Sequence, residues 1–325
     1  MGLLLALLGL TGAILLWEGE WIMLPGSGDR VVEDIARLAL ITERAATQGD
    51  LIRITFASEE IGLHQLVYAD GSGAYVRQDG RVVERWTSQW ERPELWLFDL
   101  HHRLFAGEIG EMVTGIAGVA GLLFVVSGAI LWWRSGRVFK PRLLPARFAP
   151  GPIVSHHRDL GLLATPLLLV SVLSGVLMLF DPVRAVLLGT EERPTQILQG
   201  SKVRSSAQAL TMAKSRFPEA DLRRISLPGR TGDPIVVRMR QPFEWTPHGR
   251  SQISVGADGN VTVSDAAAAN RAASLAEKAY PLHSANVGGL AWKLAMTASG
   301  IALTILGSLA MWSFWARRAH KRARR

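Results

Sequence analysis

The chain has no cysteine among its 325 residues. This absence excludes disulfide bridges, Cys-ligated zinc, iron–sulfur clusters and thiol nucleophiles. Charged residues are also sparse, at 20%, while 48% of the residues are hydrophobic and the mean hydropathy is +0.18. Tyrosine is rare, with 3 residues against 11 tryptophans, and tryptophan is enriched where membrane proteins meet the bilayer surface. The composition therefore favours a membrane protein over an ordinary cytosolic one.

Three long apolar stretches carry no charge: Met112–Trp133, Leu160–Phe180 and Leu294–Trp315. Each reaches the roughly 20 residues that a helix needs to cross a bilayer. A shorter apolar stretch at residues 1–17 is predicted to be a fourth membrane helix that lacks part of its N-terminus. A signal peptide is the alternative, which the missing cationic start and cleavage site disfavour. The predicted fold class is an α-helical membrane protein with a four-helix transmembrane bundle.

Two stretches contain cations and no acids. They are residues 134–158, with Arg134, Arg137, Lys140, Arg142, Arg147 and Arg158, and the tail, with Arg317, Arg318, Lys321, Arg322, Arg324 and Arg325. The positive-inside rule puts both in the cytoplasm. The net charge of +8 therefore reflects topology, and nucleic-acid binding is rejected because the charge is divided by a bilayer.

This orientation predicts an alternating order along the chain, with both termini cytoplasmic. The order is a membrane helix at 1–17, an outer domain at 18–109, a membrane helix at 110–133, a basic cytoplasmic loop at 134–158, a membrane helix at 159–180, an outer domain at 181–287, a membrane helix at 288–316 and a basic tail at 317–325.

Both outer segments show a helix followed by strands, separated by Asp-Gly turn signals. The first has a helical pattern from Val31 to Leu40 and strand patterns at 51–56, 63–68 and 74–77. The second has a helix at 205–217 and strands at 222–227, 234–239, 251–255 and 260–263. The repeated order predicts an internal duplication, with two extracytoplasmic α+β domains.

Each membrane helix also contains a hydroxyl–glycine pair. The pairs are Thr11-Gly12, Ser127-Gly128, Ser174-Gly175 and Ser299-Gly300. Small residues of this kind commonly allow close helix packing in membranes. A second interpretation, compatible with the first, is that glycine leaves room for a flat cofactor between helices.

Histidines recur near the ends of the spans. Leu100-His101 and Leu282-His283 each precede a glycine, Gly107 or Gly289, by the same spacing, and the spans that follow run in the same direction. Two imidazoles from two helices suit bis-histidine ligation of a haem iron, whereas zinc usually takes more ligands. We expect His101 and His283 to ligate a haem iron, with His102 a less favoured ligand because adjacent helical residues point about 100° apart.

His157 is predicted to hold a second haem at the cytoplasmic side. Its partner should come from the inner end of the first span, where this chain has no histidine. An earlier natural start than Met1, another ligand such as His320 or His156, and a degraded site all remain open. His64 and His248 are expected to be ordinary surface residues of the outer domains.

These pieces together resemble the PepSY-associated transmembrane family of iron-regulated bacterial inner-membrane proteins. The matching segments are 100–108, 127–133 and 157–163, with Ser174-Gly175 and Leu282-His283. The resemblance implies that the outer domains are PepSY-like and that His101, His157 and His283 are ligands of haem b. It also implies an oxidoreductase that reduces ferric siderophores or other ferric chelates in the periplasm.

In that hypothesis a quinol or a cytoplasmic flavoprotein supplies electrons on the inner side. Two other classes compete with it. An iron or chelate permease would place ionisable groups mid-membrane, and a PepSY sensor or assembly protein would need no cofactor. The sequence contains neither Gly-x-Ser-x-Gly nor His-Glu-x-x-His, so no hydrolase is predicted.

Overall fold

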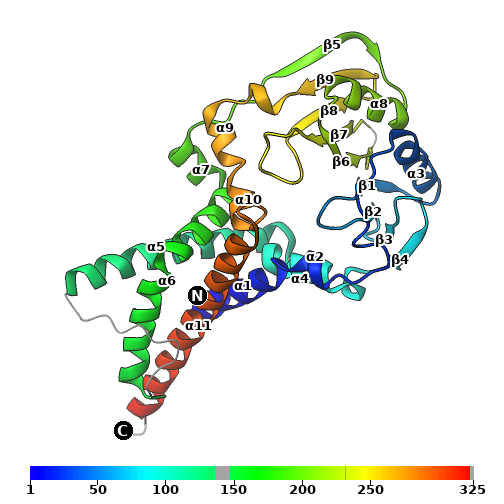
Figure 1. Cartoon of the computed structure of the whole chain (residues 1–325). Coiled ribbons are helices and arrows are strands. Elements are labelled where there is room, and N and C mark those ends of the chain that lie inside the picture. The colour runs from blue at the N-terminus through cyan, green and yellow to red at the C-terminus, as the bar shows by residue number, and fades with distance from the viewer. Residues whose placement is uncertain (136–146, 231, 323–325) are drawn as a thin grey trace. The chain divides into compact units, whose positions relative to one another are not determined.

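The computed structural model describes residues 1–135, 147–230 and 232–322. The chain divides into two compact units. The first, the helical unit, comprises residues 1–17, 96–187 and 279–325, and the second, the sheet unit, comprises residues 18–95 and 188–278. Each unit is therefore assembled from segments that lie far apart in the sequence (Figure 1).

The helical unit contains three helices that are long and apolar enough to cross a membrane. They span residues 107–134, 151–179 and 289–318 and belong to α5 (Gly107–Ser135), α6 (Pro150–Leu179) and α11 (Gly289–Arg322). The predicted first span corresponds to α1 (Gly2–Leu15), an apolar helix of 14 residues. Shorter helices α4 (Pro93–Arg103), α7 (Asp181–Leu188) and α10 (Ala279–His283) adjoin the long ones.

The helix α6 begins earlier than its charge-free stretch predicts. Residues 150–158 were expected in the cytoplasmic loop, yet they form the first turns of the helix, and most of the remaining loop, 136–146, lies outside the described residues. Proline suits the first turn of a helix because it has no N–H to leave unpaired, and Pro150 and Pro152 stand there. Arg158 and Asp159 pair with each other at 2.6 Å, so the helix accommodates both charges.

Helices α1 and α11 pack through glycine backbones. A Cβ atom on Gly9 would lie 2.6 Å from the carbonyl oxygen of Gly300, and a Cβ on Gly300 would lie 2.7 Å from the carbonyl oxygen of Gly9. Gly2 and Gly307 meet in the same way. Thr304 adds a hydrogen bond from its hydroxyl to the Ala6 carbonyl, at 3.2 Å. This is the close approach that small residues provide between membrane helices.

The sheet unit contains one antiparallel sheet of nine strands, in the order β4-β3-β2-β1-β6-β7-β8-β9-β5. The strands are β1 (Leu51–Thr55), β2 (His64–Tyr68), β3 (Gly73–Val76), β4 (Val82–Trp86), β5 (Thr195–Lys202), β6 (Asp221–Ser226), β7 (Ile235–Arg240), β8 (Ser251–Val255) and β9 (Asn260–Ser264). The predicted strands are all present; β4 and β5, at the two edges, were not predicted.

The two outer segments join through β1 and β6, where Ile54 pairs with Ile225. The predicted pair of α+β modules thus forms a single sheet and a single compact unit. Helices α3 (Ile35–Thr47) and α8 (Ser206–Arg216) pack over one face of it, around a core to which both segments contribute. Asp34 and Ser205 cap these helices, each accepting a hydrogen bond from a backbone N–H three residues on, which satisfies an otherwise unpaired helix donor.

The remaining short elements connect these parts. They are α2 (Glu18–Trp21), α9 (Arg271–Ala276) and the 3₁₀ turns η1 (Gln89–Glu91) and η2 (Ala266–Ala268).

Candidate functional site: two facing histidines

His101 lies near the end of α4 and packs against α1. Its Nδ1 atom lies 2.9 Å from the hydroxyl oxygen of Thr11, and the Leu8 carbonyl also accepts a hydrogen bond from the ring. The space for the ring comes from Gly12, where a Cβ atom would lie 3.0 Å from Cε1 of His101. The first hydroxyl–glycine pair therefore holds and accommodates this imidazole.

His283 has the same surroundings at the end of α10, against α6. Its Nδ1 atom lies 2.9 Å from the Ser171 carbonyl oxygen and 3.3 Å from the Ser174 hydroxyl. A Cβ atom on Gly175 would lie 3.1 Å from Cε1 of this ring. Carbonyl, hydroxyl and glycine follow the same spacing in both helices, so the two halves of the helical unit repeat one histidine-holding arrangement.

The two imidazoles face each other. Their ring centroids are 6.2 Å apart, with an angle of 41° between the ring planes. In both rings the contacts to hydroxyl groups fall on Nδ1. A backbone carbonyl that accepts from one ring nitrogen fixes the tautomer and leaves the other nitrogen as an electron-pair donor.

The spacing between each histidine and its glycine follows from the turn that enters the next span. Gly107 and Gly289 open α5 and α11 with φ of +56° and +60°, a left-handed conformation that glycine adopts without steric cost. Leu104 and Phe105 in one turn and Ala285 in the other also have positive φ. The turns place His101 and His283 on short helices of their own, α4 and α10, instead of on the spans.

The His102 side chain packs against Phe98. Its Nδ1 atom lies 3.0 Å from the Phe98 carbonyl oxygen, and its ring stacks on the Phe98 ring with centroids 4.0 Å apart. Among the described histidines, His283 is therefore placed opposite His101, and His102 lies beside the pair.

His156 and His157 lie inside α6. The Leu306 carbonyl of α11 accepts a hydrogen bond from the His157 ring, and both ring nitrogens of His156 are buried with no partner in the described part of the chain. The other proposed ligand, His320, lies in α11, and its side chain is outside the described residues. The described residues therefore place no second imidazole opposite His157, and they contain no group of three or more His, Asp and Glu side chains suited to a metal ion.

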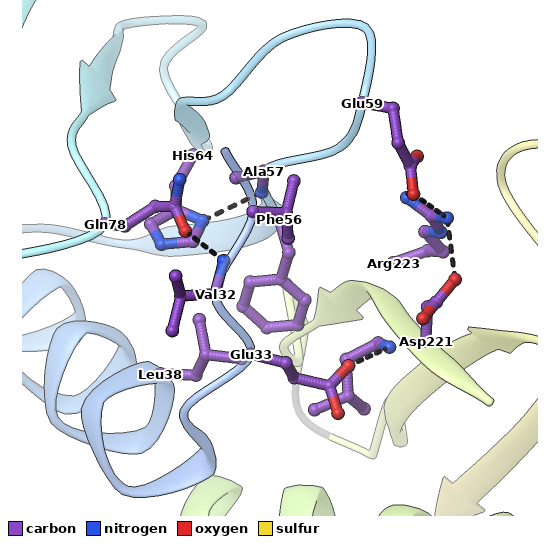
Figure 2. Close-up of a pocket in the computed structure, with 12 residues that line it drawn as sticks. Val32, Glu33, Leu38, Phe56, Ala57, Glu59, His64, Gln78, Asp221 and Arg223 are labelled. Atoms are coloured by element: carbon purple, nitrogen blue, oxygen red, sulfur yellow. Dashed lines mark hydrogen bonds and ion pairs between the residues drawn. The ribbon is translucent and has the colours of Figure 1, made fainter. Parts of the chain in front are cut away.

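A second candidate site is a cavity of about 190 Å³ in the sheet unit, lined by both outer segments (Figure 2). His64 lines it and is only 3% exposed, so the expected surface role is wrong. Its Nδ1 atom accepts the Ala57 N–H at 2.9 Å, and burial lowers its pKa to about 4. Opposite it, the buried Arg223 pairs with Glu59 and Asp221 at 3.1 and 2.9 Å.

The family comparison agrees with the helical arrangement. The PepSY-associated TM region matches residues 1–318. The chain belongs to this family. No protein with a curated description matches the sequence. Family membership and the long apolar helices together make this PepSY-associated chain a membrane protein.

The sequence predicted His101 and His283 but not the residues that hold their rings in place. Thr11 and Ser174 stood out only as members of hydroxyl–glycine pairs, because nothing in a sequence indicates which helix a ring will pack against. The spacing shared by Leu8-Thr11-Gly12 and Ser171-Ser174-Gly175 was the available signal.

Proposed function

We propose that this PepSY-associated protein binds haem b through His101 and His283 and reduces ferric siderophores or other ferric chelates. The observation that carries the proposal is the facing pair of imidazoles, 6.2 Å apart between centroids. The proposed location is a bacterial cytoplasmic membrane, with both termini in the cytoplasm and the sheet unit in the periplasm.

The residues present fit a bis-histidine haem. The 6.2 Å between the ring centroids leaves room for an iron atom that both imidazoles would hold. The donor set would contain two imidazole nitrogens, from His101 and His283, and no thiolate, because the chain has no cysteine; imidazole is a common protein ligand of haem iron. The hydrogen bonds at Nδ1 to α1 and α6 are the kind of outer contact that orients ligating histidines.

Bound haem supplies one-electron redox chemistry. The chain's own residues hold the two histidines in place. Thr11 and Ser174 orient the rings, while Gly12 and Gly175 let them sit close to the helices. Ferrous iron binds hard oxygen chelators less tightly than ferric iron, so reduction would release it for uptake.

The inner half of the proposal rests on His157. We propose that this residue takes part in a second haem site and that a quinol or a cytoplasmic flavoprotein supplies the electrons. Among the described residues, His157 lies beside His156 and donates a hydrogen bond to the Leu306 carbonyl of α11.

A visible spectrum of the detergent-purified protein tests the proposal. We expect a dithionite-reduced minus oxidised difference spectrum with sharp b-type bands, and an iron-to-chain ratio that counts the haems. His101→Ala and His283→Ala should each abolish the same bands. His102→Ala is the matched control and should keep them, because this ring lies against Phe98.

Two results would contradict the proposal. Colourless protein after incubation with hemin favours the permease or sensor alternatives. Loss of the bands in His102→Ala with retention in His101→Ala would show that the ligand is the neighbouring histidine.

A further inference from the structure

The cavity beside His64 lies at the junction of the two outer segments and entirely within the sheet unit (Figure 2). Residues between 31 and 78 line it from the first segment, and Asp221, Leu222 and Arg223 line it from the second. Its volume of about 190 Å³ is more than ten times the roughly 10–15 Å³ that one water molecule needs. A single ordered water therefore does not account for this cavity.

A β-bulge shapes the wall that the second segment supplies. The pairing of β6 with β7 shifts between Leu222 and Arg224, so Arg223 is the additional residue of the bulge. Neighbouring residues of a regular strand point to opposite faces, yet Leu222 and Arg223 both line the cavity. The Arg223 carbonyl still accepts the Phe56 N–H at 2.9 Å. The bulge thus brings a buried guanidinium to the cavity while the two segments stay joined.

Part of the lining is apolar. Leu38, Phe56 and Leu222 are at most 5% exposed, and all three belong to the core of the sheet unit. Transfer of an apolar surface from water to such a wall is favourable. This part of the cavity therefore suits the apolar body of a ligand.

The charged side chains of the lining are paired. Arg223 pairs with Glu59 and Asp221, at 3.1 and 2.9 Å, and Glu33 pairs with Lys214 at 2.5 Å. Each charged side chain that lines the cavity thus has an opposite charge within 3.1 Å. A charged ligand would have to separate one of these pairs or lose its hydration without compensation.

Two buried donors of the lining have no partner in the described part of the chain, Nε2 of His64 and Nε of Arg223. His64 Nδ1 accepts the Ala57 N–H, and burial lowers the pKa of the ring to about 4. The ring is therefore neutral near pH 7 and carries its proton on Nε2. Gln78 already has partners on both its oxygen and its nitrogen. Because a buried donor without a partner is costly, an acceptor atom of a ligand would offset that cost.

We infer that this cavity binds a small uncharged organic molecule with an apolar body and a carbonyl-type oxygen. The apolar body packs against Leu38, Phe56 and Leu222, and the oxygen accepts the Nε2–H of His64. The site does not depend on haem, because every residue that forms it belongs to the sheet unit. A bound molecule would contact both outer segments and so stabilise the folded sheet unit.

Fluorine NMR titrations of the full-length chain in detergent test the site with three probes of one shape. The probes are the uncharged 4-fluorobenzamide, the anion 4-fluorobenzoate and the cation of 4-fluorobenzamidine. We expect 4-fluorobenzamide to bind saturably, with a Kd on the order of 1 mM for so small a molecule. The two charged probes should bind at least about tenfold more weakly, because their charges would be desolvated without an unpaired counter-charge.

The variant His64→Asn should weaken 4-fluorobenzamide binding about tenfold. The amide oxygen can still accept the Ala57 N–H, whereas the ring N–H that the ligand would use is gone. A second variant, Leu38→Phe, places a larger side chain against the cavity and should weaken binding at least as much.

His248→Asn is the matched control. His248 belongs to the same sheet unit but does not line the cavity. The surface role expected for this residue is wrong too, because its side chain is half-buried, and burial, followed by the charges of the surrounding arginines, lowers its pKa to about 4. Affinity for 4-fluorobenzamide in His248→Asn should stay within about twofold of the wild type.

Melting temperatures separate loss of the site from loss of the fold. Saturating 4-fluorobenzamide should raise the melting temperature of the wild type and of His248→Asn, and it should leave that of His64→Asn nearly unchanged. A fluorine signal that changes no more than in detergent alone would overturn the site. Wild-type affinity in both His64→Asn and Leu38→Phe, or equal losses in His64→Asn and His248→Asn, would do the same. Equal binding of a charged probe would overturn the assignment to an uncharged ligand.

Discussion

His64 is an imidazole that burial keeps neutral within the core of the sheet unit. Its ring is 3% exposed, and its pKa falls from 6.5 to about 4. Nδ1 accepts the Ala57 N–H at 2.9 Å, and the Phe56 ring meets the imidazole edge-on at 5.9 Å between centroids. Protonation would place an uncompensated charge beside this ring and compete with the Ala57 hydrogen bond.

The stability of the sheet unit should therefore fall as the pH drops from about 6.5 to about 4. The unfolded chain takes up a proton near pH 6.5, whereas folded His64 does so only near pH 4. The contribution is fully present above pH 6.5 and is lost through this window. At 1.36 kcal/mol per pKa unit, the loss is about 3 kcal/mol. Denaturation midpoints measured across this range check it.

The variant His64→Asn isolates this residue. An amide oxygen can accept the Ala57 N–H as Nδ1 does and does not titrate, so the pH dependence should become shallower. The slope that remains belongs in part to His248, whose pKa is lowered to about 4 as well. An unchanged pH profile in His64→Asn would show that His64 is protonated without cost.

The four hydroxyl–glycine pairs perform different tasks in the membrane helices. Thr11-Gly12 and Ser174-Gly175 hold the facing imidazoles, while Gly300, in the pair of α11, packs against α1. At Gly128 in α5 nothing lies within 4 Å of an added Cβ atom. Close helix packing thus applies at Gly300, whereas Gly12 and Gly175 make room for an imidazole ring, and room for a flat cofactor stays a prediction.

This difference predicts contrasting results for the same substitution. Gly12→Val should displace the His101 ring, because its Cβ alone would lie 3.0 Å from Cε1. We expect it to lower the haem-to-chain ratio at least severalfold, as expected when the packing behind a ligand is disturbed. The measurement is the pyridine haemochrome assay, with Gly128→Val as the matched control. Equal haem content in the two variants would contradict the role of Gly12.

The elements were predictable where a regular pattern meets a buried surface. The apolar stretches predicted α5, α6 and α11, and alternation predicted seven strands, because those strands have one face in the core. The edge strands β4 and β5 were missed. Val82 and Ile197 are exposed there, at 43% and 69%, so their sequences carry no alternating pattern.

The two facing histidines of the candidate site were also predictable from the sequence. The Leu-His pairs predicted His101 and His283, because sequence spacing repeats when a structural unit is duplicated. The cavity beside His64 was not predicted, because both outer segments line it and their strands are joined by the β1–β6 pairing. That pairing joins residues 51–55 to residues 221–226, and no local pattern encodes it.

At the scale of the whole molecule, the sheet unit combines both outer segments into one folding unit. The segments meet at Ile54 and Ile225, which are fully buried and directly paired. Burying an isoleucine side chain is worth about 1.5–3 kcal/mol, so this junction contributes substantially to a single cooperative structure. Two independent modules would not need these residues to meet.

Ile54→Ala should therefore destabilise both segments together. A large-to-small substitution at a fully buried isoleucine lowers the free energy of unfolding by about 2–5 kcal/mol. Because the strands of both segments share one core, every strand that unfolds together with Ile54 should be destabilised. Hydrogen exchange followed by mass spectrometry on the full-length protein should show faster exchange in β2 of the first segment and in β7 of the second. Val82→Ala, on the exposed edge strand β4, is the control and should change exchange by much less. Faster exchange confined to residues 51–86 would mean that the two segments unfold independently, which would contradict a single cooperative sheet unit.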